Sequence, residues 1–163
     1  LYTAIRFSIA GLVMLPNTSS AWNKPELIGR CIIMGFFVFL GYFGQGLGMS
    51  LGSSANKSAF ICSMNCVWVA LLQIITSSIF KAQTWLSILL AICGVAILEL
   101  QGSEPIALGD YWLILQPIGF GTGYVLLESL MVEYPEEATA ITSFKLLVIA
   151  LFDSSSFLKS SKV

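Results

Sequence analysis

The sequence predicts an all-α fold, a polytopic bundle of transmembrane helices, and two observations lead to this prediction. The 163 residues are 56% hydrophobic and only 10% charged, with a mean hydropathy of +0.86, whereas soluble chains contain about a quarter charged residues. The charges also leave long uncharged runs, at 31–56, 58–80, 82–98 and 111–127. Because about 20 apolar residues of helix cross the hydrocarbon core of a bilayer, these runs predict membrane spans.

Six helical segments follow from the hydropathy pattern. The first reads as the second part of a helix that ends at Pro16, and the last is interrupted by Lys145. Beyond the last segment, the Ser-rich composition of 153–163 predicts a disordered tail. The segments lie near 1–15, 31–52, 58–80, 83–100, 110–132 and 138–152.

Charge and residue usage exclude several classes of function. With eight Lys and Arg against nine Asp and Glu, no basic surface is available for nucleic acid. Histidine is absent, which removes the commonest metal ligand and general base. Cys62 and Cys66 lie one turn apart without further ligands, so we interpret them as packing residues. No metal, no cofactor and no catalytic residues are predicted.

The positive charges in the loops orient the chain. Lys24, Arg30 and Lys81 lie at one end of the predicted helices, here called face A, and Lys57 lies at the opposite end, face B. Because cytoplasmic loops carry an excess of Lys and Arg, face A is expected in the cytosol or its equivalent in an organelle. The sequence leaves open whether the membrane is the plasma membrane or an organelle membrane.

Small residues predict a close contact between two successive helices. The face formed by Gly44, Gly48 and Gly52 permits close approach of backbones. We expect this face to pack on the side of the next helix that carries Ser58, Cys62 and Asn65.

Three amide side chains predict a polar level within the membrane. At about 1.5 Å per residue, Gln45 and Asn65 reach about 12 Å below face B, and Gln116 arrives at a similar depth. Pro117 removes a backbone hydrogen bond directly beside Gln116. The amides indicate either the wall of a polar cavity or hydrogen bonds between helices, and the sequence leaves both interpretations open.

Two cations lie close to the predicted midplane. Arg6 and Lys145 are each about 12 to 14 Å from face A, and no carboxylate of the chain is equally deep. Such cations pair, face a cavity or snorkel. Our hypothesis is that they attract an anionic or strongly polar metabolite in a central cavity. Trp68 or Tyr124 would add apolar contact there.

A series of motifs resembles the EamA-type drug/metabolite transporter superfamily. One motif is the helix start at 54–63. Two more, 85–86 and 91–98, belong to the predicted helix 83–100, and Gly109-Asp110 precedes the predicted helix 110–132. Arg6-Phe7 and Leu15-Pro16 resemble the family's second helix. The match extends in order up to Phe152. The chain departs from the pattern at Cys66, Ala70, Ser78, Gly121 and Glu128-Ser129, which bear on the substrate more than on the fold.

The resemblance implies a fold of two inverted repeats of five helices, of which this chain would hold helices two to seven. Residues 1–100 would be an incomplete first repeat, 101–108 the linker and 109–152 the start of the second repeat. The implied function is secondary transport of a small polar or anionic metabolite by alternating access.

Two other classes of function compete with transport. The alternative is a non-transporting membrane subunit whose glycine-rich faces pack on partner proteins. A membrane enzyme is disfavoured because no nucleophile has a base. The expected partners are the lipid bilayer and a small metabolite, with a homodimer left open.

Overall fold

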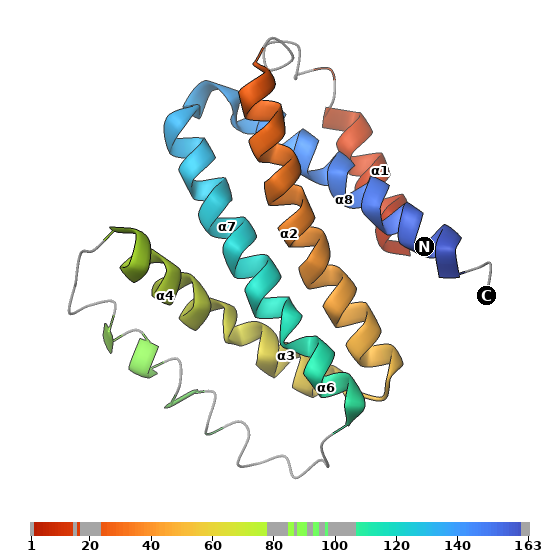
Figure 1. The fold of residues 1–163 in the computed structure, drawn as a ribbon, viewed down its shortest axis with the longest axis vertical. Helices are drawn as coiled ribbons and strands as arrows, with labels where there is room; N and C mark the ends of the chain where they lie inside the picture. Colours follow the sequence, from red (N-terminus) through yellow and green to blue (C-terminus); the bar gives the residue numbers. More distant parts are fainter. Residues whose placement is uncertain are drawn as a thin grey trace. The chain divides into compact units, whose positions relative to one another are not determined.

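The described part of the chain consists of helices joined by short turns. The computed structural model describes residues 2–14, 16, 24–77, 85–86, 88–90, 93–94, 97 and 107–160. These residues contain no strand, which confirms the all-α class for the part described. The elements of Figure 1 are α1 (Tyr2–Met14), α2 (Pro25–Ser50), α3 (Ala55–Ser63), α4 (Asn65–Ser77), α6 (Leu108–Leu113), α7 (Leu115–Glu133), the short 3₁₀ turn η3 (Pro135–Glu137) and α8 (Ala138–Ser160).

Within these residues, three helical segments are long and apolar enough to cross a membrane. They are Pro25–Ser50, Ala55–Thr76, which joins α3 and α4, and Leu108–Glu133, which joins α6 and α7. The chain is therefore compatible with an integral membrane protein, and the multi-pass arrangement stays a prediction. The predicted span at 83–100 lies mostly outside the described residues.

The start of α2 lies earlier in the chain than the sequence predicts. The helix begins at Pro25 rather than near residue 31. Proline suits the first helical position because its fixed φ is helical and its missing N–H has no intrahelical partner there. Glu26 in the first turn adds a favourable interaction with the helix dipole. Arg30 consequently lies on the helix and not in the preceding loop.

The chain divides into two compact units. Unit 1 comprises Leu1–Phe39 and Leu126–Val163, and unit 2 comprises Leu40–Val125. Both α2 and α7 contribute residues to each unit. The repeat boundaries expected near 100 and 109 stay predictions.

The core of unit 1 lies between α2, α7 and α8. Leu27, Cys31 and Met34 of α2 are fully buried, and their spacing places them on one helix face. They form a cluster with Leu130 of α7 and with Ala140, Ile141 and Phe144 of α8. Burying one such side chain contributes about 1.5 to 3 kcal/mol where the alternative is water. In lipid the gain comes instead from close packing.

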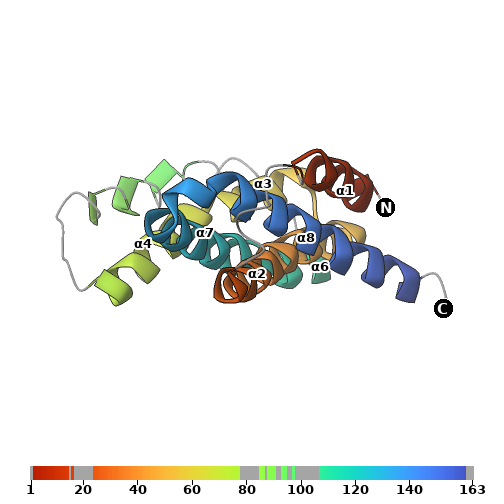
Figure 2. The same ribbon diagram turned by 90° about the horizontal axis from the view of Figure 1, so that it is seen from above.

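Helix α1 packs along α8 within the same unit, as the view of Figure 2 shows. Gly11 allows the approach, since a Cβ there would lie 2.8 Å from the side chain of Leu147. Farther along α8, Phe152 stacks on Phe39 of α2 with ring centroids 5.4 Å apart. The segment predicted at 1–15 is therefore helical, and it forms part of a packed bundle.

The predicted tail requires a correction, because α8 continues to Ser160. The Ser-rich composition predicts an end of the helix at 152 and disorder from 153 onward. One physical reason for the difference is visible at Ser154, whose Oγ donates a 2.7 Å hydrogen bond to the carbonyl of Ala150 one turn earlier. A serine bonded in this way satisfies its hydroxyl without leaving the helix.

The glycine face of α2 packs on a different partner from the one predicted. In unit 2, a Cβ on Gly44 would lie 2.8 Å from Leu115, and one on Gly48 would lie 2.6 Å from Leu113. The nearest neighbours of these glycines thus belong to α6 and α7, and not to the side of α3 that carries Ser58 and Cys62. The close backbone approach itself was predicted correctly.

Gly52 ends α2 and does not pack against a helix. Its φ is +98°, and a Cβ there would have no neighbour within 4 Å among the described residues. The N–H of Ser53 donates to the carbonyl of Gly48 at 3.2 Å, and the N–H of Gly52 donates to Met49 at 3.3 Å. This pair of bonds is a Schellman motif, which requires a left-handed residue after the helix. The predicted packing role of Gly52 is therefore wrong.

Two of the three candidate spans are interrupted. Met64 separates α3 from α4, and its N–H donates to the carbonyl of Ile61, three residues back, at 3.1 Å. Ile114 separates α6 from α7. Pro117 explains the second break, because it cannot donate to the carbonyl of Leu113 and its ring collides with that carbonyl. The hydrogen bond that the sequence predicts to be lost at Pro117 therefore coincides with the break at Ile114.

Candidate functional site

The two interrupted segments meet in unit 2 along a set of polar side chains that we call the polar seam. Its members come from α3, α4 and α7. They are Ser58, Asn65, Trp68, Gln116 and Thr122.

The first contact of the seam joins Ser58 to Gln116. The Ser58 hydroxyl donates to Oε1 of Gln116 at 3.4 Å. The two residues are only 2% and 1% exposed. A buried amide that finds a protein partner behaves as expected for a hydrogen bond between helices. For Gln116, the helix-to-helix interpretation is therefore the one that the geometry favours.

The second contact surrounds Gly121 of α7. The Nε1 of Trp68 donates to the Thr122 hydroxyl at 3.2 Å. A Cβ on Gly121 would lie 2.5 Å from the Trp68 ring and 2.7 Å from Oδ1 of Asn65. The missing side chain of Gly121 thus makes room for α4 on this face of α7.

Asn65 has a buried acceptor that remains unsatisfied. Its Oδ1 is inaccessible to solvent and accepts no hydrogen bond from any residue that the structure describes. Leaving such an atom unpaired costs about 1 to 3 kcal/mol. Asn65 is also the first residue of α4, directly after the break at Met64. Within the described residues, this acceptor is therefore left unused at the break between α3 and α4.

The seam ends toward face B at an ionic cluster. Asp110 accepts from the hydroxyl of Ser53 at 2.5 Å and from Nζ of Lys57 at 2.9 Å. It also accepts from the backbone N–H of Ala107 at 2.9 Å, as a residue in the first turn of a helix can. The Lys57 and Asp110 side chains are 14% and 16% exposed. The cluster joins the N-terminal turns of α3 and α6.

Two further residues of unit 2 that the sequence predicts in the site, Gln45 and Tyr124, are not members of the polar seam. Gln45 is half-buried on α2, and its side chain has no hydrogen bond in the described part of the chain. Tyr124 is 47% exposed, one turn from Phe120, with ring centroids 6.5 Å apart. Of the three amides expected at one level, the seam therefore contains Asn65 and Gln116.

The two predicted cations belong to unit 1. Arg6 is exposed, and its guanidinium lies 5.3 Å from the centroid of the Phe7 ring. Lys145 is half-buried on α8, and no ion pair involves it among the described residues. Their combination with the unit 2 residues in one cavity stays a prediction.

Face A of unit 1 carries two ion pairs that were not predicted from the sequence. Nζ of Lys24 lies 3.1 Å from Oε1 of Glu137, and Arg30 pairs with Glu133. Lys24 also lies 5.4 Å from the centroid of the Tyr134 ring. The hydroxyl of Tyr134 bonds to Glu133, which raises the pKa of that phenol above its usual range. Lys24 and Arg30 are placed at face A, and Glu133 and Glu137 fall in the loop between the predicted helices 110–132 and 138–152 at the same face. Opposite charge at a common level was therefore the available signal.

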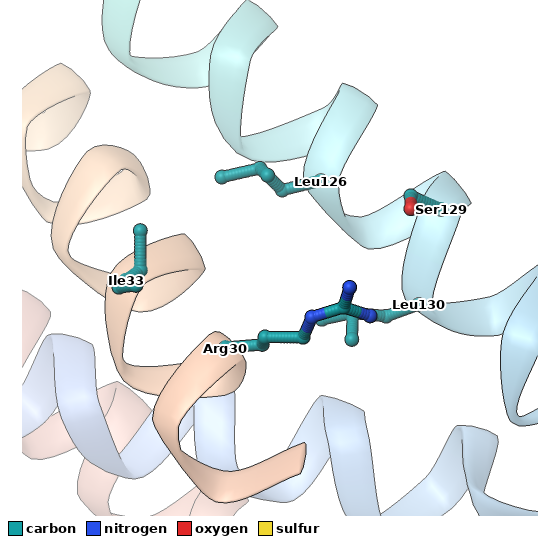
Figure 3. A pocket seen from close by; sticks show the side chains of 5 residues that line it. All are labelled: Arg30, Ile33, Leu126, Ser129 and Leu130. Atoms are coloured by element: carbon teal, nitrogen blue, oxygen red, sulfur yellow. The ribbon is translucent and has the colours of Figure 1, made fainter. Parts of the chain in front are cut away.

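A pocket of about 110 Å³ lies beside the Arg30 pair in unit 1. Figure 3 shows its lining, in which Arg30 and Ile33 come from α2 and the other three residues from α7. Those three are Leu126, Ser129 and Leu130. The pocket differs from the polar seam in composition. Three of its five lining side chains are aliphatic, and the other two are one charged and one hydroxyl side chain.

The residues that sequence reasoning missed are those that complete each contact. Ser53, Lys57, Gly121 and Thr122 were not predicted in any site, and Asp110 was predicted only as a helix start. Lys57 and Asp110 carried a detectable signal, because opposite charges at the same face B invite pairing. No comparable signal identifies Thr122.

Comparison with known proteins adds no relative. No protein-family model, no curated protein and no solved structure matches the chain.

Proposed function

We propose that residues 1–163 are part of a secondary carrier of the EamA type that moves a small polar or anionic metabolite by alternating access. In this proposal the chain spans helices two to seven of a ten-helix fold with two inverted repeats. The motif series from Arg6 to Phe152 supports the family, and the helical, apolar character of the described residues is compatible with it.

The unsatisfied Oδ1 of Asn65 is the observation on which the proposal depends. It lies at the break between two helical pieces, beside a second interrupted helix. Interrupted helices in transporters place substrate contacts near the bilayer midplane, where irregular backbone lines a cavity. At eight residues from Lys57, Asn65 is about 12 Å from face B. In the proposed transport cycle, α4 and α7 separate and expose this atom, and a substrate with a hydroxyl or amine group then supplies the missing donor.

The alternative of a non-transporting subunit has less support. It relied on glycine faces free to receive a partner protein. Gly44 and Gly48 are instead covered by residues 109–116 of the same chain. We therefore retain transport as the single proposed function.

The test is uptake of labelled metabolites into proteoliposomes by the complete carrier to which the chain would belong. We expect Asn65→Ala to lower the apparent affinity for the transported metabolite by about tenfold, the loss of one good hydrogen bond. Stability in detergent should stay equal or rise, because the variant removes an unpaired buried acceptor.

The matched control is Asn56→Ala, on the exposed face of α3. This variant should transport like the unmodified protein. If Asn65→Ala raises stability and leaves uptake unchanged for every solute tried, Asn65 is only a poorly satisfied packing residue. In that case the proposed site is wrong.

A further inference from the structure

The pocket beside Arg30 places polar groups and aliphatic groups in a definite order along the helices. Arg30 lies five residues inside the start of α2, and Ser129 lies four residues before the end of α7. At about 1.5 Å per residue, both are about 6 to 8 Å from face A. Ile33 and Leu126 lie one turn deeper on the same two helices, and Figure 3 shows the order.

This order matches the profile of a bilayer leaflet. The headgroup layer is about 6 Å thick on each side of a hydrocarbon core of about 30 Å. If α2 and α7 span the membrane, Arg30 and Ser129 lie near the boundary between headgroups and acyl chains. Ile33, which is 54% exposed, then faces the level of the acyl chains. An amphiphile with its polar end toward face A would match both parts of the pocket.

The charges at the pocket specify the polar end of that amphiphile. Arg30 pairs with Glu133, and each side chain is 45% exposed. A guanidinium has five N–H donors, so the pair leaves several of them for a phosphate. The side chain of Ser129 has no hydrogen bond to any described residue, and its hydroxyl is available to the same phosphate.

Glu133 places a negative charge directly beside the phosphate-binding donors. A purely anionic headgroup would be repelled by this carboxylate. A zwitterionic headgroup with an ammonium group would place its phosphate on Arg30 and its amine on Glu133. A primary ammonium can donate hydrogen bonds to the carboxylate, whereas a quaternary choline cannot.

We propose that this pocket is a binding site for a phospholipid with a primary amine headgroup, of the phosphatidylethanolamine type, in the leaflet at face A. Arg30 and Ser129 hold the phosphate, Glu133 accepts from the ammonium, and one acyl chain lies over Ile33 and Leu126. The site requires that α2 and α7 are inserted in a membrane. It does not require that the protein transports a metabolite.

The experiment measures lipid retained by the purified full chain, by native mass spectrometry after reconstitution in vesicles with equal amounts of phosphatidylethanolamine, phosphatidylcholine and phosphatidylglycerol. We expect phosphatidylethanolamine to be retained about tenfold over either competitor. Arg30→Gln should lower the retention of phosphatidylethanolamine about tenfold. Glu133→Gln should bring the ratio of retained phosphatidylethanolamine to retained phosphatidylcholine close to one. Because the pair is exposed, neither variant should prevent folding.

Two matched controls isolate the pocket. Lys24→Gln breaks the other ion pair at face A without touching the pocket lining, and should bind lipid normally. Ile33→Trp fills the aliphatic part and should reduce retention of every lipid. Ile32→Trp adds the same bulk at a neighbouring exposed position outside the pocket, and should not.

Several results overturn the proposal. They are equal retention of the three lipids, a preference for phosphatidylglycerol, or wild-type retention by Arg30→Gln. Displacement of the lipid by inorganic phosphate alone would reassign the site to a free anion. If Arg30→Gln fails to fold, equal retention by Ile33→Trp and Ile32→Trp overturns it. A chain that does not insert in vesicles overturns it as well, whereas a carrier that binds the lipid and moves no metabolite contradicts only the proposed function.

Discussion

Asp110 shows how much a single side chain can organise in this protein. It accepts hydrogen bonds from Ser53, Lys57 and the N–H of Ala107, and so links the loop after α2 with the first turns of α3 and α6. Hydrogen bonds to a charged group are stronger than neutral ones. The low exposure of the Lys57 and Asp110 side chains limits competition from water.

We expect Asp110→Asn to destabilise unit 2 by about 1 to 2 kcal/mol, because the ion pair is lost while Lys57 keeps its charge. Unfolding in a denaturing detergent, followed by tryptophan fluorescence, measures the change. A double-mutant cycle with Lys57→Met should show coupling between the two positions. Additive effects of the two substitutions would mean that the pair contributes nothing of its own.

Lys145 is the residue-scale test of an anionic substrate. It is half-buried on α8 without an ion pair among the described residues. In the complete carrier, Lys145→Gln should lower the apparent affinity for anionic solutes by about tenfold and leave neutral solutes unaffected, since only the charge is removed. Competition of labelled uptake by anionic and neutral solutes measures this. Unchanged affinity for every anionic solute would assign Lys145 to the membrane interface by snorkelling.

At the scale of elements, glycine decides where helices touch. Gly48 lies against Leu113 and the backbone of Gly109, so that α2 and α6 approach closely in unit 2. A Cβ on Gly46, two residues earlier on the same helix, would have no neighbour within 4 Å in the part of the chain that the structure describes. The two glycines therefore have different roles although their sequence surroundings are alike.

Gly48→Leu should lower the melting temperature in detergent, because the new side chain collides with Leu113 and with the carbonyl of Gly109. The free energy of unfolding should fall by about 1 to 3 kcal/mol or more, as it does at other overpacked sites. Gly46→Leu is the matched control and should be close to neutral. Equal melting of the two variants would contradict the contact between α2 and α6.

At the scale of the whole molecule, one candidate span has little cover from the residues that the structure describes. The most apolar 18-residue stretch of Ala55–Thr76 contains no buried residue. The proposed carrier would cover this segment with helices beyond residues 1–163, and its midplane site would need both repeats.

We therefore expect residues 1–163 alone to show no solute uptake when reconstituted in proteoliposomes. The complete carrier, inserted in equal amount, is the positive control, and protease protection of the loops checks that both insert. Uptake by residues 1–163 at the rate of the complete carrier would contradict the two-repeat proposal.

The sequence predicted the elements better than their partners. Hydropathy predicted a helix on both sides of the turn at 51–54, and Pro117 predicted the break that the structure has at Ile114. The sequence interpretation placed the end of α8 too early. It also assigned Gly52 to helix packing, although Gly52 is the left-handed residue that terminates α2 after Ser50. The candidate site was predicted in part, since Asn65, Trp68 and Gln116 belong to the seam, while Gly121 and Thr122 were missed.

By itself, the sequence determined that this is a helical protein with segments suited to lipid, without a basic surface, histidine chemistry or a predicted metal centre. These properties depend on composition and on the local order of apolar residues, which are independent of how helices pack. Only the tertiary structure decided that Gly48 meets Leu113, that Lys57 meets Asp110, and that Oδ1 of Asn65 is left without a donor among the described residues. Such contacts join residues up to 65 positions apart, and their choice among competing partners depends on the relative rotation and height of whole helices.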